Sequence, residues 1–339
     1  MKKLFIIAAA ACVTLASCVK NEPVASVEQG DLITFAAPLV APATKAVGTV
    51  KYPETGTFKL YGWYHAAKDG DFQNKYIAAE TVSKQTGNYF APSTSYYWPK
   101  SGYLSFFAYS PATLIAEGGT LSVSEMSLAK SMALTYTVAS EQAKQDDLLY
   151  SDWAEGKTAS DVVTLPEEMG SYEGIEIVFN HALSAVLFNF SGEENMYKIT
   201  SVTLSGIKKT AVLTSTPDLT SWAAPTGESV SYEILGEHEV SGTVETSDLL
   251  MLIPQSLGAA KLTINYSLKN PSAAEWIPQD AKVINLNSAT DSESNAIANW
   301  DMGTKYTYNI TFGAASVIKF APSVVGEWTG VTGTVPEIQ

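Results

Sequence analysis

The chain has 339 residues, of which 46% are hydrophobic and 17% charged, and its formal net charge is -14 at pH 7. All 21 basic residues are lysines, so the chain has no arginine. An acidic chain without the planar guanidinium groups that bind phosphates is not suited to nucleic acid or anionic lipid headgroups, and we expect no nucleic-acid partner. The length is sufficient for two ordinary domains.

The first residues have the layout of a secretory signal. Lys2 and Lys3 precede an apolar run over 4–13, which leads to Leu15-Ala16-Ser17-Cys18. A Cys directly after small residues is what a lipoprotein signal peptidase requires. We therefore predict a signal peptide over 1–17 and acylation of Cys18, which would anchor the mature protein in the outer membrane. A plain signal with an accidental Cys and a transmembrane anchor are the alternatives, but the apolar run is too short to span a bilayer.

Cysteine and histidine usage argues against a catalytic or metal site. The two cysteines are Cys12, inside the signal, and Cys18, so the mature chain is predicted to have neither a disulfide nor a thiolate metal site. The histidines His65, His181 and His238 are scattered, and no metalloprotease, hydrolase or dinucleotide-binding motif occurs. We predict no catalytic residue, no metal and no cofactor.

The elements predicted after the signal are β-strands, because short runs rich in Val, Ile, Thr, Tyr and Phe are bounded by Gly, Pro, Asn and Ser. The run 103–109 is apolar on both faces, which is typical of a strand buried inside a sandwich. Short helical insertions are expected over 128–134 or 140–148, and the adjacent Asp146 and Asp147 are expected to be solvated loop charges. The other predicted strands are 59–64, 175–179, 185–190, 199–204, 249–253, 261–268, 283–286, 306–312 and 317–325.

This spacing of strands predicts an all-β protein built of sandwiches. We expect a linker over 18–30, an N-terminal domain over 31–192, and a C-terminal domain with an end strand over 193–339.

Two segments near the ends of the mature chain resemble each other. Residues 33–40 read Ile-Thr-Phe-Ala-Ala-Pro-Leu-Val, and residues 318–325 read Ile-Lys-Phe-Ala-Pro-Ser-Val-Val. Alternating apolar positions in each could fill the same row of pockets in a β-groove, and a proline in each suits an edge strand. These positions are Ile33, Phe35, Ala37 and Leu39 in the first segment and Ile318, Phe320, Pro322 and Val324 in the second.

A linker of small residues over 41–48 follows the first segment and contains Lys45-Ala46, a trypsin-like cleavage site. If the chain is cut after Lys45, the first strand can leave and its groove can accept a similar strand from a neighbour, which is polymerisation by strand addition. Chance similarity of two edge strands is the alternative. In the exchange interpretation Ile318, Phe320 and Val324 are the candidate donor residues, and a variant of it donates Val331, Val335 and Ile338 instead.

The chain resembles the fimbrillins, the subunits of type V pili, over nearly its whole length. The resemblance rests on the order of several weak motifs. They are the Cys18 signal, Thr44-Lys45-Ala46, Tyr97-Trp98-Pro99, 104–111, 147–150, 179–183, 250–255, 306–311, and Ile318 and Phe320 with Trp328.

Membership of that family implies two transthyretin-like β-sandwich domains in tandem, export as an outer-membrane lipoprotein, proteolytic loss of the N-terminal strand and head-to-tail assembly at the cell surface. The implied partners are other copies or related pilus subunits, a trypsin-like processing protease and a host or bacterial surface ligand. No catalysis is implied. His181 is then expected to be a structural histidine, and Trp98 and Trp328 to be packing residues.

Two alternatives stay open. The best-known processing in the family follows an arginine, whereas here the candidate is Lys45, so either a broader trypsin-like enzyme acts or the subunit stays uncut. An uncut subunit would be an anchor or terminator, because its groove remains filled. A monomeric surface lipoprotein that binds glycans shares the signal, the acidity and the sandwiches, but it needs neither the paired end segments nor the cleavable linker.

Overall fold

The computed structural model describes residues 31–36, 39–41, 50–114, 119–126, 130–167, 170–193, 196–240, 242, 244–270, 272, 275–313 and 317–327. The predicted signal peptide, Cys18, Ala37, Lys45 and Ala46, and Trp328 lie outside these residues. The described chain is almost entirely β-strand, which confirms the all-β prediction. No helix in the described ranges is long and apolar enough to cross a membrane.

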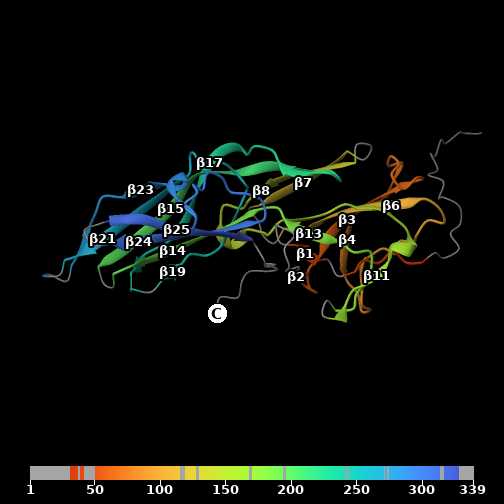
Figure 1. Cartoon of the computed structure of the whole chain (residues 1–339), viewed down its shortest axis with the longest axis horizontal. Coiled ribbons are helices and arrows are strands. Elements are labelled where there is room, and N and C mark those ends of the chain that lie inside the picture. The colour runs from red at the N-terminus through yellow and green to blue at the C-terminus, as the bar shows by residue number, and fades with distance from the viewer. Residues whose placement is uncertain are drawn as a thin grey trace, which may run out of the picture.

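A nine-stranded sheet forms the first lobe, which lies at one end of the molecule in Figure 1. Its order is β2-β1-β13-β9-β6-β3-β4-β5, with β10 also paired to β6. A separate two-stranded ladder joins β11 (Val163–Thr164) to β12 (Glu173–Gly174). The bounds of the nine strands are β1 Leu39–Ala41, β2 Val50–Lys51, β3 Phe58–His65, β4 Asn74–Lys84, β5 Phe90–Pro92, β6 Tyr103–Ser110, β9 Leu149–Ser151, β10 Ala154–Lys157 and β13 Val178–His181.

Two facing sheets form the second lobe, at the other end of Figure 1, and enclose a core of its own. One sheet has the order β19-β14-β24-β25 with β20 on β14, and the other has the order β22-β21-β15-β8-β7 with β16, β17 and β18 on β15 and β23 on β21. The bounds of the first sheet are β14 Ser184–Gly192, β19 Glu245–Thr246, β20 Leu250–Leu252, β24 Thr304–Gly313 and β25 Val317–Glu327. Those of the second are β7 Thr120–Met126, β8 Ser131–Thr137, β15 Tyr197–Ser215, β16 Thr220–Trp222, β17 Thr226–Leu235, β18 His238–Glu239, β21 Lys261–Lys269, β22 Trp276–Pro278 and β23 Lys282–Asn285.

The 19-residue strand β15 connects the lobes. Its first part, from Tyr197 to Ser205, pairs with β21, and its last part, from Thr210 to Ser215, pairs with β8. A hairpin from the first half of the sequence, β7–β8, therefore completes a sheet of the second lobe, between the two ends of Figure 1. The division at residue 192 stays a prediction; β14, which it assigns to the first domain, pairs with β19, β20 and β24 of the second lobe.

Strand β6 is buried on both faces, as its sequence predicts. Leu104, Phe106 and Ala108 face the core of the first lobe. Phe107 and Tyr109 face a second cluster, which we call the inter-lobe core and which contains Leu134 of β8, Leu213 of β15 and Met251 of β20. The sheet of the first lobe is therefore covered on its outer face by strands that belong to the second.

The predicted strands at 59–64, 103–109, 185–190, 199–204, 249–253, 261–268, 283–286, 306–312 and 317–325 are confirmed, and 175–179 is confirmed from Val178 onward, with Ile175 in a single bridge. The helix expected over 128–134 is wrong, because residues 131–134 belong to β8, where Met132, Leu134 and Tyr136 alternate into the inter-lobe core. Burial of alternate side chains outweighs helix propensity there. Over 140–148 a single 3₁₀ turn, Gln142–Lys144, is found. Strands β4, β7 and β17 were not predicted, since their half-exposed, polar sequences carry a weak signal.

Replacement of Leu134 tests the packing of the hairpin against the first lobe. Because Leu134 is 0% exposed, Leu134→Ala should lower the free energy of unfolding by about 2–5 kcal/mol. Leu219, which is 65% exposed, is the matched control, and Leu219→Ala should change it by less than about 0.5 kcal/mol. Urea unfolding followed by tryptophan fluorescence measures both; equal effects would contradict the inter-lobe core.

Candidate assembly site at the N-terminal segment

The N-terminal segment, residues 31–36 and 39–41, lies between two strand edges and hydrogen-bonds to both. On one side it runs antiparallel to residues 90–98. The Ile33 amide donates to the Tyr96 carbonyl at 2.8 Å, Phe35 and Phe90 exchange two backbone hydrogen bonds of 2.9 Å each, and the Trp98 amide donates to the Asp31 carbonyl at 3.0 Å. This edge belongs to β5 and to the loop that follows it.

On the other side the segment runs parallel to residues 175–180. The Ile175 amide donates to the Thr34 carbonyl at 2.8 Å, and the Ala36 amide donates to the Ile175 carbonyl at 3.0 Å. Further along, β1 pairs with β13 in parallel, with Leu39 opposite Val178. The segment thus joins the last strand of the sheet, β5, to the β13 edge, and its removal would leave two unpaired edges at once.

The side chains of the segment are part of the core of the first lobe. Ile33, Phe35 and Ala36 are 0% exposed and Val40 is 2% exposed. The Phe35 ring meets the Phe106 ring edge-on, with centroids 5.3 Å apart. Burial of a side chain such as Phe35 contributes roughly 1.5–3 kcal/mol, so the groove that holds the segment is apolar and closely packed.

The predicted inward positions hold for Ile33 and Phe35, whereas those at Ala37 and Leu39 stay predictions. Ala37 lies outside the described residues, and the side chain of Leu39 is not described. The buried residues Ala36 and Val40 depart from strict alternation. Phe35 lies opposite Ile175 and Leu39 lies opposite Val178, so the pairing register differs by one residue between these two points.

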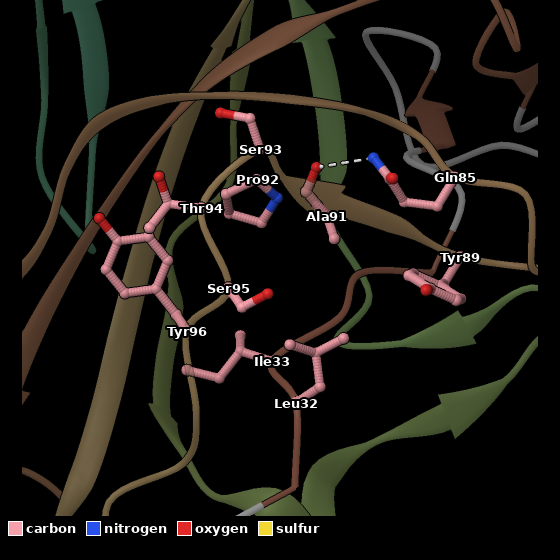
Figure 2. Close-up of a pocket in the computed structure, with 10 residues that line it drawn as sticks. All are labelled: Leu32, Ile33, Gln85, Tyr89, Ala91, Pro92, Ser93, Thr94, Ser95 and Tyr96. Atoms are coloured by element: carbon pink, nitrogen blue, oxygen red, sulfur yellow. Dashed lines mark hydrogen bonds between the residues drawn. The ribbon is translucent and has the colours of Figure 1, made fainter.

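A small hollow of about 110 Å³ borders the start of the segment at Leu32 and Ile33. Figure 2 shows its lining side chains, which are all neutral, and the hydrogen bond from the Gln85 amide to the Ala91 carbonyl beside it. Ser93, Thr94 and Ser95 on its rim are exposed. At this end the segment therefore lies close to solvent, whereas Phe35 lies deep in the core.

The candidate donor residues Ile318, Phe320 and Val324 lie in β25, which pairs antiparallel with β24 of the same chain. Ile318 is 4% exposed and belongs to the core of the second lobe, and Phe320 is half-buried with its ring 5.7 Å from that of Tyr308. Val324 is 60% exposed. Strand β25 is at the edge of its sheet, and a groove of about 430 Å³ separates Ile318 and Phe320 from β23.

Two buried histidines of the first lobe have polar partners within hydrogen-bonding distance. His181 Nδ1 lies 3.0 Å from Asp147 Oδ1, and both side chains are buried, so the expected structural histidine is found. Asp146 and Asp147 are 1% and 7% exposed, so the expectation of solvated loop charges is wrong; the chain folds this loop into the junction beside Tyr136. His65 Nε2 lies 3.0 Å from Ser105 Oγ, which itself accepts from the Gly156 amide.

Two aromatic residues of the first lobe, Tyr52 and Trp98, are also buried. Burial raises the pKa of Tyr52, whose ring packs in the core that holds the segment, to about 12. Trp98 is 5% exposed and packs edge-on against Phe106, as expected of a packing residue. Among the described residues no group of three His, Cys, Asp or Glu side chains could hold a metal ion.

A family model described as fimbrillin-like matches residues 44–328. The chain belongs to the fimbrillin-like family. A fimbrial protein from Bacteroides vulgatus has a similar structure, with a TM-score of 0.58 and 16% identity over 88% of this chain and 99% of that one. A candidate cell adhesion protein from Bacteroides uniformis has a TM-score of 0.50 and 16% identity, covering 88% of this chain and 98% of that one. No curated protein sequence gives a significant match.

This fimbrillin-like chain is therefore a pilus protein by family. The family implies a non-enzymatic subunit that assembles with other pilus subunits at the cell surface.

Truncation of Phe35 tests how much the segment stabilises the first lobe. Phe35→Ala should lower the free energy of unfolding by about 3–5 kcal/mol, because the residue is fully buried among aromatic rings. Thr34→Ala is the control, since the hydrogen bond at residue 34 uses only the backbone carbonyl. Denaturant unfolding of the uncut chain measures both, and a Phe35→Ala variant as stable as Thr34→Ala would contradict the role of the segment in the core.

Proposed function

We propose that this chain is a pilus subunit that is exported as a lipoprotein, acylated at Cys18, cleaved between Lys45 and Ala46, and polymerised by exchange of its N-terminal segment for a strand of a neighbouring subunit. The observation that carries the proposal is the position of the segment between two strand edges. A strand that leaves this position exposes two rows of backbone donors and acceptors together with an apolar groove. An incoming β-strand can satisfy all of these at once.

The place of Lys45 in the sequence, between β1 and β2, supports the cleavage step. Ala41, at the end of β1, and Val50, at the start of β2, bracket the sequence that contains Lys45. Many other lysines lie in paired strands, such as Lys59 in β3 and Lys198 in β15, where the backbone is protected from proteases. A trypsin-like enzyme would therefore cut in the linker first.

The donor strand in this proposal is β25 of the neighbouring subunit, with Ile318, Phe320 and Val324 entering the groove. Before it can leave, the pairing with β24 must break, together with one bridge on its other side, where the Ser323 amide donates to the Thr290 carbonyl at 2.8 Å. The half-buried Phe320 and the exposed Val324 make that separation less costly than removal of a central strand would be. Donation of the residues beyond Glu327, with Val331, Val335 and Ile338, is the other form of the proposal.

The rival function, a monomeric lipoprotein that binds glycans, needs exposed aromatic side chains as platforms for sugar rings. Of the described tryptophans, Trp63, Trp98 and Trp300 are 1%, 5% and 1% exposed, and Trp153, Trp222 and Trp276 are partly buried. In the part of the chain that the structure describes, no tryptophan is exposed as a sugar platform, so we do not favour the rival over assembly.

Limited trypsin treatment of the full chain tests the cleavage step. The first cut should follow Lys45, and soluble oligomers should appear only afterwards, because the segment is then free to leave. Lys45→Gln should abolish both, whereas Lys282→Gln, in the exposed β23, should behave like the native chain. N-terminal sequencing and size-exclusion chromatography provide the measurements. Early cuts confined to the interior of the chain, or normal oligomers from Lys45→Gln, would contradict the proposal. Material from cells that begins at lipidated Cys18 would also contradict it and would indicate an anchor or a monomeric lipoprotein.

Charged substitutions in β25 test which strand is donated. Val324 and Val325 are neighbours that are 60% and 40% exposed, so Val324→Asp and Val325→Asp should each change monomer stability by less than about 1 kcal/mol. If β25 is donated in the register that aligns residues 318–325 with 33–40, Val325 takes the place of Val40, which is 2% exposed, so Val325→Asp should abolish oligomers, since a buried unpaired carboxylate is costly. If Val324 enters the groove instead, Val324→Asp should abolish them and Val325→Asp should not. Normal oligomers from both variants would exclude donation of β25 and favour the residues beyond Glu327.

A further inference from the structure

Gly174 lies directly against the backbone of the N-terminal segment. A Cβ placed on Gly174 would lie 2.5 Å from the Phe35 Cα and closer still to the Phe35 N and C atoms. Side chains do not occur at such distances, and backbone atoms of a paired strand cannot rotate away as the end of a flexible side chain can. Gly174 also has a φ of +146°, a conformation that residues with a side chain rarely adopt.

The contact with Gly174 lies where the groove holds Phe35 and Ala36, which are both fully buried. The Phe35 ring meets the rings of Phe106 and Phe58 edge-on, at centroid distances of 5.3 and 6.5 Å. The next residue, Ala36, is 0% exposed, and its amide donates to the Ile175 carbonyl at 3.0 Å. A larger side chain at this position would have to displace core atoms.

The two positions before Phe35 differ in the side chain that the groove requires. Ile33 is 0% exposed and therefore needs an apolar side chain, whereas the side chain of Thr34 is half-buried and its backbone carbonyl makes the hydrogen bond to Ile175. The groove thus discriminates at three of four consecutive positions. A strand shifted by one residue would turn its apolar side chains outward, and one shifted by two would put a β-branched residue where the aromatic ring fits.

We propose that the groove is selective for a β-strand of the form apolar, any residue, aromatic, small, and that Gly174 fixes its register by requiring the aromatic residue to lie backbone to backbone against it. This selectivity rests on the proposed function, in which another strand can replace the segment. The occupant is a second copy of this chain, through residues 317–327. Ile318-Lys319-Phe320-Ala321 has this form and is identical to Ile33-Thr34-Phe35-Ala36 at three of the four positions, whereas residues 328–339 contain no aromatic residue after Trp328.

Peptides test the selectivity on the full chain cleaved by trypsin after Lys45. A fluorescent peptide with the sequence of residues 317–327 should bind, and its Lys319→Gln form should bind equally, because this position corresponds to Thr34. The Ala321→Phe form should bind between about fivefold and about 150-fold more weakly, as overpacking requires. The Phe320→Ala form should lose at least as much. Fluorescence anisotropy measures all four, and uncut chain is the reference in which the groove is filled.

Two glycine variants of the full chain test the register contact. Gly174→Ala should weaken peptide binding after cleavage at least about tenfold and, in the uncut chain, should make Phe35 accessible to chymotrypsin. Gly227→Ala is the matched control, because Gly227 also has a positive φ, +84°, but a Cβ there would have no atom within 4 Å. Gly227→Ala should resemble the native chain in both measurements.

The outcomes separate this inference from the proposed function. If the native peptide does not bind the cleaved chain, strand exchange through β25 fails, and the selectivity for it fails as well. If all four peptides bind equally, or if Gly174→Ala behaves like Gly227→Ala, strand exchange survives and the selectivity is overturned. If Gly174→Ala does not fold, the peptide series on the native chain still decides.

Discussion

The structure of the first lobe depends on the pairing of one short segment with two edges. Residues 31–36 and β1 hydrogen-bond to residues 90–98 on one side and to residues 175–180 on the other, and their side chains complete the core between them. Each edge by itself would be a row of unpaired donors and acceptors. The segment therefore supplies hydrogen bonds and apolar burial together, and a strand that replaces it must supply both.

The N-terminal segment and β25 differ in their pairing and burial. The N-terminal segment is paired on both sides and Phe35 is fully buried. Strand β25 is paired along its length with β24, has a single bridge at Ser323 on its other side, and carries the exposed Val324. A strand with two paired edges and a buried aromatic ring loses more on leaving than an edge strand does. In the assembly that we propose, the more deeply buried N-terminal segment therefore blocks the groove until the chain is cut in the 42–49 linker. Cleavage there would control when assembly begins.

The rear wall of the groove is shared with the second lobe. Strand β6 turns Phe106 toward the N-terminal segment and Phe107 toward the inter-lobe core, which β8 and the last part of β15 complete. Because interiors pack at crystal-like density, side chains on both faces of β6 hold its position. The aromatic walls of the groove are thus supported from behind by strands of the other lobe.

The sequence by itself determined the all-β class, most strand positions, the doubly buried β6 and the inward positions Ile33 and Phe35, because alternation of apolar residues depends only on the chain's own periodicity. Only the tertiary structure decided that β7 and β8 join the second lobe, that Asp146 and Asp147 are buried, and that Ala36 lies inward beside Phe35. It also decided that Gly174 lies against Phe35, which is 139 residues away in the sequence. These features depend on which distant segments meet, and local sequence carries no record of partners brought together by the fold.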